Sequence, residues 1–353
     1  APQVAHLWGK PYFYKYKMIK RILYTLLIMF PVLASAQINT DRVMAIGRNA
    51  LYFEDYVLSI QYFNQVINAK PYLSDPYFYR GLAKINLDDF QGAESDCSEA
   101  IERNPFVVSA YQVRGLARIQ QNNFAGAIED YTKALEFDPE NIGVWHNMAL
   151  CRIRQEDYKG AKNDLDKLIA ISPRYTKAYL MRGEVDLKQK DTLAAEKDFG
   201  KAIEIDRYDA DTWASRAILR LQQQRYKDAE ADFDHAIRLS TRNSGVYINR
   251  ALARYHQNNL RGAMSDYDIA LDIDPNNFIG HYNRGLLRAQ VGDDNRAIQD
   301  FNFVIEMEPD NMMAIFNRGL LLDQTGDYKG AIKDYSTVIN EYPNFLLGYQ
   351  YRA

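Results

Sequence analysis

The sequence contains very little cysteine: Cys97 and Cys151 are the only two among 353 residues. Two cysteines cannot build a disulfide framework, and these two lack the paired spacing of a zinc site. Both fall on faces that the helical pattern described below turns inward, where cysteine behaves as a small apolar residue. We therefore expect two free, buried thiols.

An excess of charge of one sign is also absent. The chain has 43 Lys and Arg against 46 Asp and Glu, a net charge of -3, so it offers no overall electrostatic footprint for nucleic acid. Charged residues make up 25% and hydrophobic residues 47% of the chain, which excludes wholesale disorder and a polytopic membrane protein. We expect a chain that buries a core and has no nucleic-acid partner.

Motifs of catalysis and of cofactor binding do not occur. The chain has no HExxH, Walker loop, G-x-G-x-x-G or nucleophile elbow. Four histidines lie beyond residue 36, each at a different position of the repeat described below, so they do not predict a metal site: His146, His235, His256 and His281. The sequence therefore predicts no enzyme and no metal or other cofactor.

Long apolar runs are missing except near the N-terminus. Residues 18–36 contain two basic residues, a mostly apolar run from Ile22 to Leu33, and small residues that end at Ala36. This is the order of a secretory signal peptide, and the run is shorter than the roughly 20 residues that span a bilayer. The pattern predicts cleavage after Ala36, a periplasmic or secreted protein, and no stable membrane insertion of the mature chain.

Residues 1–17 precede this signal-like segment and carry several aromatic and basic side chains. Because signal peptides seldom have such an extension, we interpret them as an upstream leader foreign to the protein. A genuine aromatic and basic leader is the alternative. Residues 37–39 are then a short linker.

What the sequence does have is a repeat of 34 residues. With position 1 at Thr40, position 32 is proline in seven repeats, and Arg207 and Thr241 occupy it in the other two. Position 8 is always Gly or Ala, position 20 is Ala in all repeats but the first, and position 24 is always apolar or aromatic. Nine gapless repeats thus cover residues 40–345, and residues 346–353 are the truncated start of a tenth.

Each repeat predicts a hairpin of two helices. Small residues at positions 8 and 20 let the helices approach closely, the bulky residue at 24 fills the space beside them, and the proline ends the second helix. In residues 108–141 the pair Asn122-Asn123 marks the turn between helices expected at about positions 2 to 14 and 17 to 30. The predicted fold class is all-α, a solenoid of tandem helical hairpins.

The pattern resembles that of the tetratricopeptide repeat family. Besides the small residues and the proline, position 4 is aromatic in six repeats: Tyr77, Tyr111, Trp145, Tyr179, Trp213 and Tyr247. The resemblance covers residues 40–345. It implies a right-handed superhelix that binds proteins or peptides along its concave side.

Two residue columns depart from the plain family pattern, and the first combines Arg at position 7, where the family usually has Leu, with Asp at position 23. Because both recur together, we interpret them as a structural ion-pair ladder that fixes the register of the repeats. The sequence leaves open whether each Arg pairs within its own repeat or with the neighbouring one. A second Arg row at position 11 lies one turn on and can share the same aspartates. The ladder consists of Arg80, Asp96, Arg114, Asp130, Arg182, Asp198, Arg216, Asp232, Arg250, Asp266, Arg284, Asp300, Arg318 and Asp334.

The second departure is Asn at position 6, one of the positions that usually face the groove in the family. An amide side chain offers a donor and an acceptor to the backbone of an extended peptide, although a solvated helix surface is the alternative. Position 5 adds aromatic side chains, which can equally pack between neighbouring helices. The candidate groove residues are Asn147, Asn249, Asn283, Asn317, Phe78, His146, Tyr282 and Phe316.

The sequence thus predicts a non-catalytic scaffold of the cell envelope that binds an extended protein or peptide segment in a concave groove. The alternative is the sensory or substrate-docking portion of a larger signalling protein or transferase whose other domains lie beyond residue 353.

Overall fold

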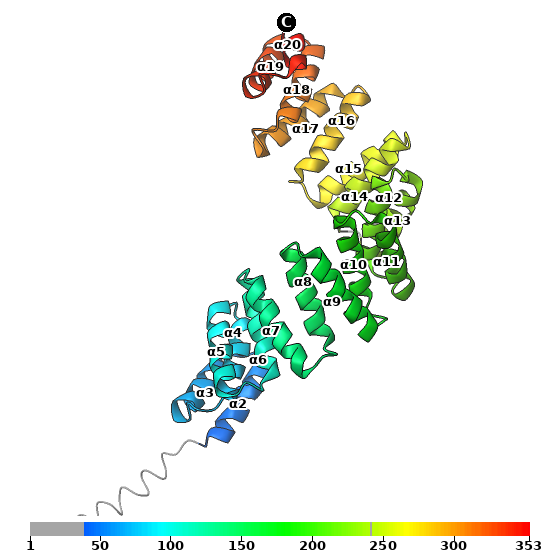
Figure 1. Cartoon of the computed structure of the whole chain (residues 1–353). Coiled ribbons are helices and arrows are strands. Elements are labelled where there is room, and N and C mark those ends of the chain that lie inside the picture. Colours follow the sequence, from blue (N-terminus) through cyan, green and yellow to red (C-terminus); the bar gives the residue numbers. More distant parts are fainter. Residues whose placement is uncertain (1–38, 241) are drawn as a thin grey trace, which may run out of the picture. The chain divides into compact units, whose positions relative to one another are not determined.

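The computed structural model describes residues 39–240 and 242–353, and in these residues every regular element is an α-helix (Figure 1). The all-α fold class of paired helices is thereby confirmed. The leader and signal-peptide predictions for residues 1–17 and 18–36 lie outside the described residues. Within the described residues, no helix is long and apolar enough to cross a membrane.

The helices belong to two compact units, which divide between Gln155 and Glu156, in the turn of the fourth repeat. In the first unit each helix packs on the next, and the first helices of neighbouring hairpins also touch. Its helices are α2 (Thr40–Tyr52), α3 (Tyr56–Ala69), α4 (Asp75–Ile85), α5 (Phe90–Arg103), α6 (Val108–Gln120), α7 (Phe124–Phe137) and α8 (Ile142–Arg154).

The second unit repeats the same arrangement from the second helix of repeat four onward (Figure 1). Its helices are α9 (Tyr158–Ile171), α10 (Thr176–Lys188), α11 (Thr192–Ile205), α12 (Ala210–Gln222), α13 (Tyr226–Leu239), α14 (Ser244–His256), α15 (Leu260–Ile273), α16 (Phe278–Gln290), α17 (Asp294–Met307), α18 (Met312–Gln324), α19 (Tyr328–Glu341) and α20 (Leu346–Arg352).

The turn inside each repeat is built by positions 15 and 16. Position 15 adopts a left-handed backbone with φ between 59° and 64° in seven repeats, and Gly292 and Gly326 occupy it in the last two. A left-handed residue ends the first helix, because it cannot continue the right-handed coil. In seven repeats the Asp or Asn at position 16 then caps the second helix by accepting a hydrogen bond from the backbone N–H three residues on: Asp55, Asp89, Asn123, Asp157, Asp191, Asn259 and Asp327.

The core of each hairpin lies where the small residue at position 8 meets the bulky one at position 24. A Cβ atom added to Gly115 would come within 2.7 Å of the Tyr131 ring, which is a distance that no relaxed structure tolerates. Tyr131 and the neighbouring Ala127 are fully buried. Cys97 takes position 24 in repeat two, and it and Cys151 are buried and free, as predicted.

In four repeats the aromatic residue at position 4 donates a hydrogen bond to the end of the preceding repeat. Tyr77 and Trp145 donate hydrogen bonds of 3.2 and 2.8 Å to the carbonyl oxygens of Pro71 and Pro139, which lie at position 32. Trp213 makes the same bond to Arg207, at 2.9 Å. Large amphipathic rings suit this place because they bury an apolar body and still satisfy a backbone acceptor.

Candidate binding surfaces

The ion-pair ladder forms inside the hairpins. In all seven predicted pairs, the Arg at position 7 reaches the Asp at position 23 of its own repeat with closest N–O distances between 2.5 and 2.8 Å. Two guanidinium nitrogens face the carboxylate, as in Arg250, whose Nε and Nη2 donate to Asp266. Such bidentate, charge-assisted bonds offset the cost of burying an aspartate that is almost completely enclosed.

The same arginines also connect neighbouring repeats, through a partner that the sequence pattern did not single out. In six of them the third nitrogen, Nη1, donates to the side chain at position 25 of the preceding repeat, over distances of 2.6 to 3.0 Å. These acceptors differ in type, which hides the column in the sequence: Asn64, Ser98, Asp166, Asp234, Asp268 and Asn302. Each Arg therefore joins the second helices of two successive hairpins.

The second Arg row, at position 11, shares the buried aspartates. Arg118 and Arg254 contact Asp130 and Asp266 at 3.0 and 2.9 Å. Their remaining nitrogens reach a glutamate at position 21 of the preceding repeat, so Arg118 lies 2.8 Å from Glu94. Arg220 and Glu196 repeat this contact at 3.1 Å.

Arginine lowers and burial raises the pKa of each of these carboxylates, and the balance between the two differs with depth. Burial raises the pKa of Asp130 even though Arg114 and Arg118 oppose it. Burial also acts to raise the pKa of Glu94 and of Glu196, but at these more exposed sites the hydrogen bonds from arginine outweigh it and the pKa lies below its usual value. Glu94 and Glu196 are therefore held as anions.

One joint of the ladder has the opposite polarity. Asp186 occupies position 11 of repeat five, where five other repeats have Arg, and it is only 1% exposed. It accepts a hydrogen bond of 2.5 Å from Lys162, at position 21 of the preceding repeat. Between α9 and α10 the ion pair is therefore present, but the base lies at position 21 and the acid at position 11.

The four candidate groove asparagines are all partly exposed. Asn317 donates a 3.1 Å hydrogen bond to the Tyr282 hydroxyl, so the structure brings two predicted groove residues together. No hydrogen bond joins the amides of Asn249 and Asn283 to any described residue. Asn147 lies on α8 in the first unit.

The aromatic groove candidates differ in their exposure to solvent. Phe316 is only 7% exposed and its ring is enclosed by Phe345 and Tyr351, with centroids 5.1 and 5.8 Å away, so it is core rather than free ligand-binding surface. Phe78 packs against its neighbour Tyr79, with the two rings tilted by 58°, and against the core of repeat two, and it remains partly exposed. His146 and Tyr282 are also partly exposed.

Position 9 completes the groove side of the first helices. Leu116 and Leu286 remain 38% and 39% exposed there, although both are large apolar residues. Repeat five has an exposed acid, Glu184, at this position, and the sequence signal for it is the break in a column of leucines. Although the side chain keeps accessible surface, neighbouring groups partly desolvate its carboxyl and raise its pKa, and the charge of Asp211 adds to the rise. Among the described residues, no cluster of His, Cys, Asp and Glu could hold a metal ion.

Comparison with known families places repeat models on most of the chain. A model described as TPR repeat matches residues 115–151, and one described as tetratricopeptide repeat matches 142–175 and 176–209. A second tetratricopeptide repeat model matches 215–278 and 282–344. No curated protein matches the chain.

Solved structures with the same repeats share the fold at low sequence identity. A tetratricopeptide repeat protein from Parabacteroides merdae is 21% identical with a TM-score of 0.55, over 70% of this chain and 98% of its own. The C-terminal part of a TPR repeat-containing protein from Cytophaga hutchinsonii is 17% identical with the same TM-score, over 68% of this chain and 98% of its own. A chain of Cut9–Hcn1, a hetero-tetramer of the APC/C, is 11% identical with a TM-score of 0.52, over 83% of this chain and 58% of its own.

Proposed function

The chain is a tetratricopeptide repeat protein, and from that premise we propose that it is a scaffold of the cell envelope which binds extended protein or peptide segments on the groove side of its first helices. The repeats themselves imply a protein- or peptide-binding scaffold, and proteins built from them are typically non-catalytic. We propose in addition that the binding surface is the groove and that the location is the cell envelope.

The observation that carries the proposal is the pair of unengaged amides at Asn249 and Asn283. They occupy the same position of α14 and α16, the first helices of consecutive hairpins, and no described residue hydrogen-bonds them. Each amide can donate to a carbonyl and accept from an N–H, which is what the backbone of an extended peptide presents at regular intervals. The exposed Leu286 at position 9 adds apolar surface beside them.

The ion-pair ladder lies on the other side of the first helices, and its position supports peptide binding on the groove side. Positions 6 and 9 lie about 200° around the helix from positions 4 and 7, so the groove side is separate from the Arg–Asp contacts. Those contacts hold successive hairpins together. A surface whose repeats are held in place loses less conformational freedom when a peptide binds.

The test is the triple variant N249A/N283A/N317A of the full chain. A peptide selected from a random display library against the wild type serves as the probe, and its affinity is measured by fluorescence anisotropy. Because each lost hydrogen bond removes about 0.5–1.5 kcal/mol, we expect binding to weaken about tenfold or more. Helicity should be retained, because the helix propensity gained from alanine offsets the loss of the hydrogen bond between Asn317 and Tyr282.

The matched control is N163A/N295A/N340A, which removes three exposed asparagines from the second helices α9, α17 and α19. Both triple variants replace three helical asparagines with alanine, so a difference in affinity between them reports the position of the amides. Equal affinity of the two variants for the selected peptide would remove the asparagine column from the proposal.

The location in the envelope rests on the signal-like residues 18–36, which are followed directly by the linker and the first repeat. A basic start, a short apolar run and small residues before Gln37 are what the export machinery and its peptidase recognise.

A further inference from the structure

One arginine of the ladder lacks the partner that all the others have. Six of the seven arginines at position 7 donate through Nη1 to a side chain at position 25 of the preceding repeat. Arg216 donates to Asp232 through Nε and Nη2, and its Nη1 has no hydrogen-bond partner among the described residues. The reason is Gly200, which occupies position 25 of repeat five and has no side chain to offer.

The place of the missing side chain is open space. A Cβ atom built on Gly200 would meet nothing within 4 Å. Gly200 lines a cavity of about 490 Å³ together with Lys197 and Lys201, and a second cavity of about 550 Å³ adjoins it, because Glu204 lines both. Cavities of this size accommodate several side chains of a ligand rather than one small ion.

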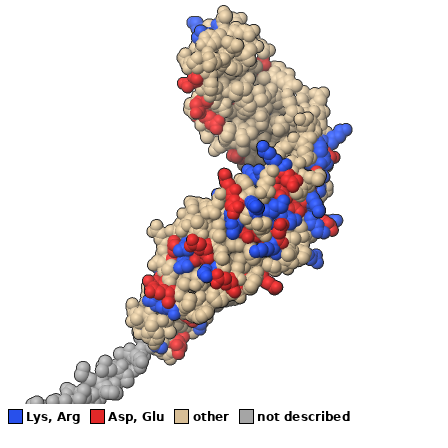
Figure 2. Space-filling model, viewed as in Figure 1, with Lys and Arg blue, Asp and Glu red and all other residues tan. Residues whose placement is uncertain are grey.

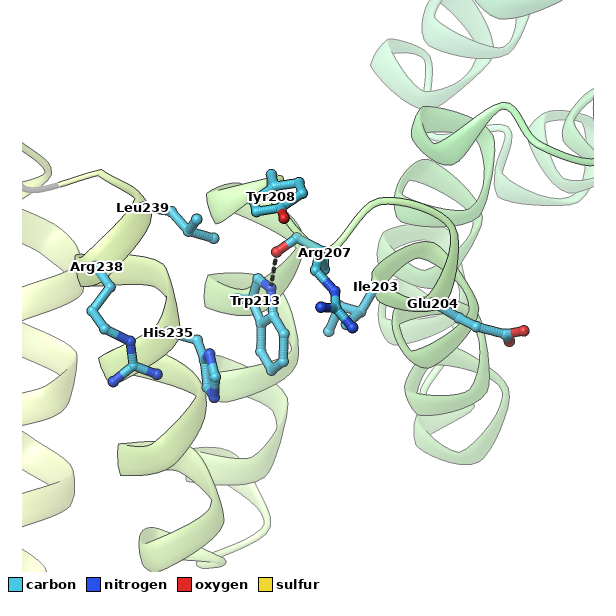
Figure 3. A pocket seen from close by; sticks show the side chains of 8 residues that line it. All are labelled: Ile203, Glu204, Arg207, Tyr208, Trp213, His235, Arg238 and Leu239. Carbon is cyan, nitrogen blue, oxygen red and sulfur yellow. Dashed lines mark hydrogen bonds between the residues drawn. The ribbon is translucent and has the colours of Figure 1, made fainter.

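The second cavity is formed by α11, α12 and α13 around Trp213 (Figure 3). The Trp213 ring stacks on His235 with a centroid distance of 4.2 Å, and the Arg216 guanidinium lies 5.1 Å from the ring centroid. The indole N–H is already bonded to the carbonyl of Arg207. Trp213 therefore contacts His235 and Arg216 through its ring, and its own polar atom is already bonded within the chain.

Positive charge at this joint is not neutralised by the chain. The guanidinium groups of Arg207 and Arg238 line the second cavity, and neither forms an ion pair with a described residue. The acid that both cavities share, Glu204, is engaged by Lys201 at 3.0 Å. On the face drawn in Figure 2, the middle of the molecule carries acidic and basic side chains intermixed.

Two departures from the repeat pattern coincide here. Arg207 stands at position 32, where seven repeats have proline, and Gly200 stands at position 25, where six joints have an oxygen acceptor. The first adds a cation and the second removes an internal anion or dipole. Tyr208 and Leu239 add exposed aromatic and apolar surface at the rim, with 75% and 38% of their surfaces accessible.

We propose that this cleft, the Gly200–Trp213 cleft, is a second binding site, which takes an acidic peptide segment. A carboxylate of the peptide occupies the place of the missing side chain and accepts a hydrogen bond from Nη1 of Arg216. Further carboxylates pair with Arg207 and Arg238, and an apolar or aromatic residue packs on Tyr208 and Leu239. The site uses positions 4, 7 and 25 to 33 of the repeats, so it is independent of the asparagines at position 6.

The first test compares G200D with G200A in the full chain. The probe is a short fluorescein-labelled peptide of alternating Glu and Tyr, and binding is followed by anisotropy at low salt. Asp at position 200 restores the internal acceptor found at other joints, so it should compete with the peptide and weaken binding about tenfold or more. Ala gains helix propensity but no acceptor and should leave binding within about twofold of the wild type.

The second test reverses charge in the other cavity. R207E/R238E should also weaken binding about tenfold or more, whereas R174E/R261E, the same charge change at two exposed arginines outside the cleft, should change it far less. A peptide in which Gln replaces Glu should not bind the wild type. The four substituted arginines are exposed, so these variants should fold and can test the proposal even if G200D alters the fold.

Equal binding by wild type, G200D and R207E/R238E would overturn the proposal. So would displacement of the peptide by millimolar inorganic phosphate together with binding of the Gln peptide, because the cleft would then be a small-anion site beside a non-specific contact. Loss of binding in N249A/N283A/N317A but not in G200D would assign the probe to the asparagine column instead. The two proposed sites can therefore be refuted independently.

Discussion

At the scale of single residues, the arginine at position 7 is the most heavily engaged side chain of the repeat. Arg250 donates to Asp266 and Asp234 and lies 5.4 Å from the centre of the Tyr247 ring, while its own side chain is 12% exposed. A lysine could not reproduce this, because one ammonium cannot form the planar two-point contact and also span to the next helix. Met148 at the same position of repeat four shows that an apolar residue can replace it.

The aspartate should matter more than the arginine it binds. In D266A both Arg250 and Arg254 lose a buried partner, whereas in R250M Asp266 keeps Arg254 at 2.9 Å. Breaking a buried pair costs up to about 3–5 kcal/mol when the remaining charge has no other partner. Because Arg250 and Arg254 keep the more exposed Asp234 and Glu230, we expect D266A to stay below that limit and still to cost clearly more than R250M. Native-state hydrogen exchange of the α14 and α15 amides measures both. An equal loss in the two variants would contradict the shared role of Asp266.

The lowered pKa of Glu94 gives a prediction for pH. A carboxylate whose pKa is depressed on folding stabilises the native state above its unfolded value, taken as 4.5, and that contribution disappears as the pH falls through the lower folded value. The variant E94Q should therefore be less stable than the wild type at pH 7, and the difference should shrink below about pH 4.5. Urea denaturation followed by circular dichroism across this range measures the difference. A gap that stays constant with pH would rule out the Arg118 contact as its source.

At the scale of helices, the sequence was sufficient to locate the elements, because their ends are chemically marked. The second helices begin at position 17 as expected, directly after the capping residue, and Asn122 and Asn123 form the predicted turn. The contacts between helices were harder to predict. Position 25 holds Asn, Ser or Asp in different repeats, so its common role as an acceptor for Arg is invisible until the helices are brought together.

The burial of Phe316 was missed for a related reason. Helical periodicity places position 5 on the groove side, and it does so correctly for Tyr282, which stays partly exposed. Phe316, however, is covered by the ring of Phe345, which immediately precedes α20, and by the ring of Tyr351 within α20. Periodicity predicts which side of a helix a residue lies on, but whether the neighbouring helix covers it depends on the size of that neighbour's side chains.

The exchanged ion pair between α9 and α10 can be tested as a unit. K162E should destabilise the joint, because it places a second acid against the buried Asp186, and D186R should do so because it faces Lys162. The double variant K162E/D186R recreates the Glu–Arg arrangement of Glu94 with Arg118 and should recover most of the loss. We expect a coupling energy of about 1–3 kcal/mol from the double-mutant cycle, measured by thermal unfolding. Simple additivity of the two single losses would contradict the exchange.

At the scale of the whole molecule, each compact unit is held together by contacts between successive helices and hairpins, as in other repeat proteins. Local departures such as Gly200 and Glu184 can therefore give one joint its own binding properties without disturbing hairpins further along. This is why a chain whose fold follows from nine repetitions of one pattern can carry a site at a single joint. Sequence repetition predicts the scaffold, and the exceptions to it mark where function is to be sought.

The location of the molecule depends on the segment before the repeats. If residues 18–36 act as a signal peptide, the chain produced in a bacterium with a general secretory pathway should be recovered outside the cytoplasm with Gln37 as its first residue. Mass spectrometry of the intact protein measures this directly. A36D should accumulate as uncleaved precursor, because the peptidase requires a small residue there, and A36G should be processed normally. A cytoplasmic chain that retains residues 18–36 would refute export and leave the peptide-binding scaffold to be sought inside the cell.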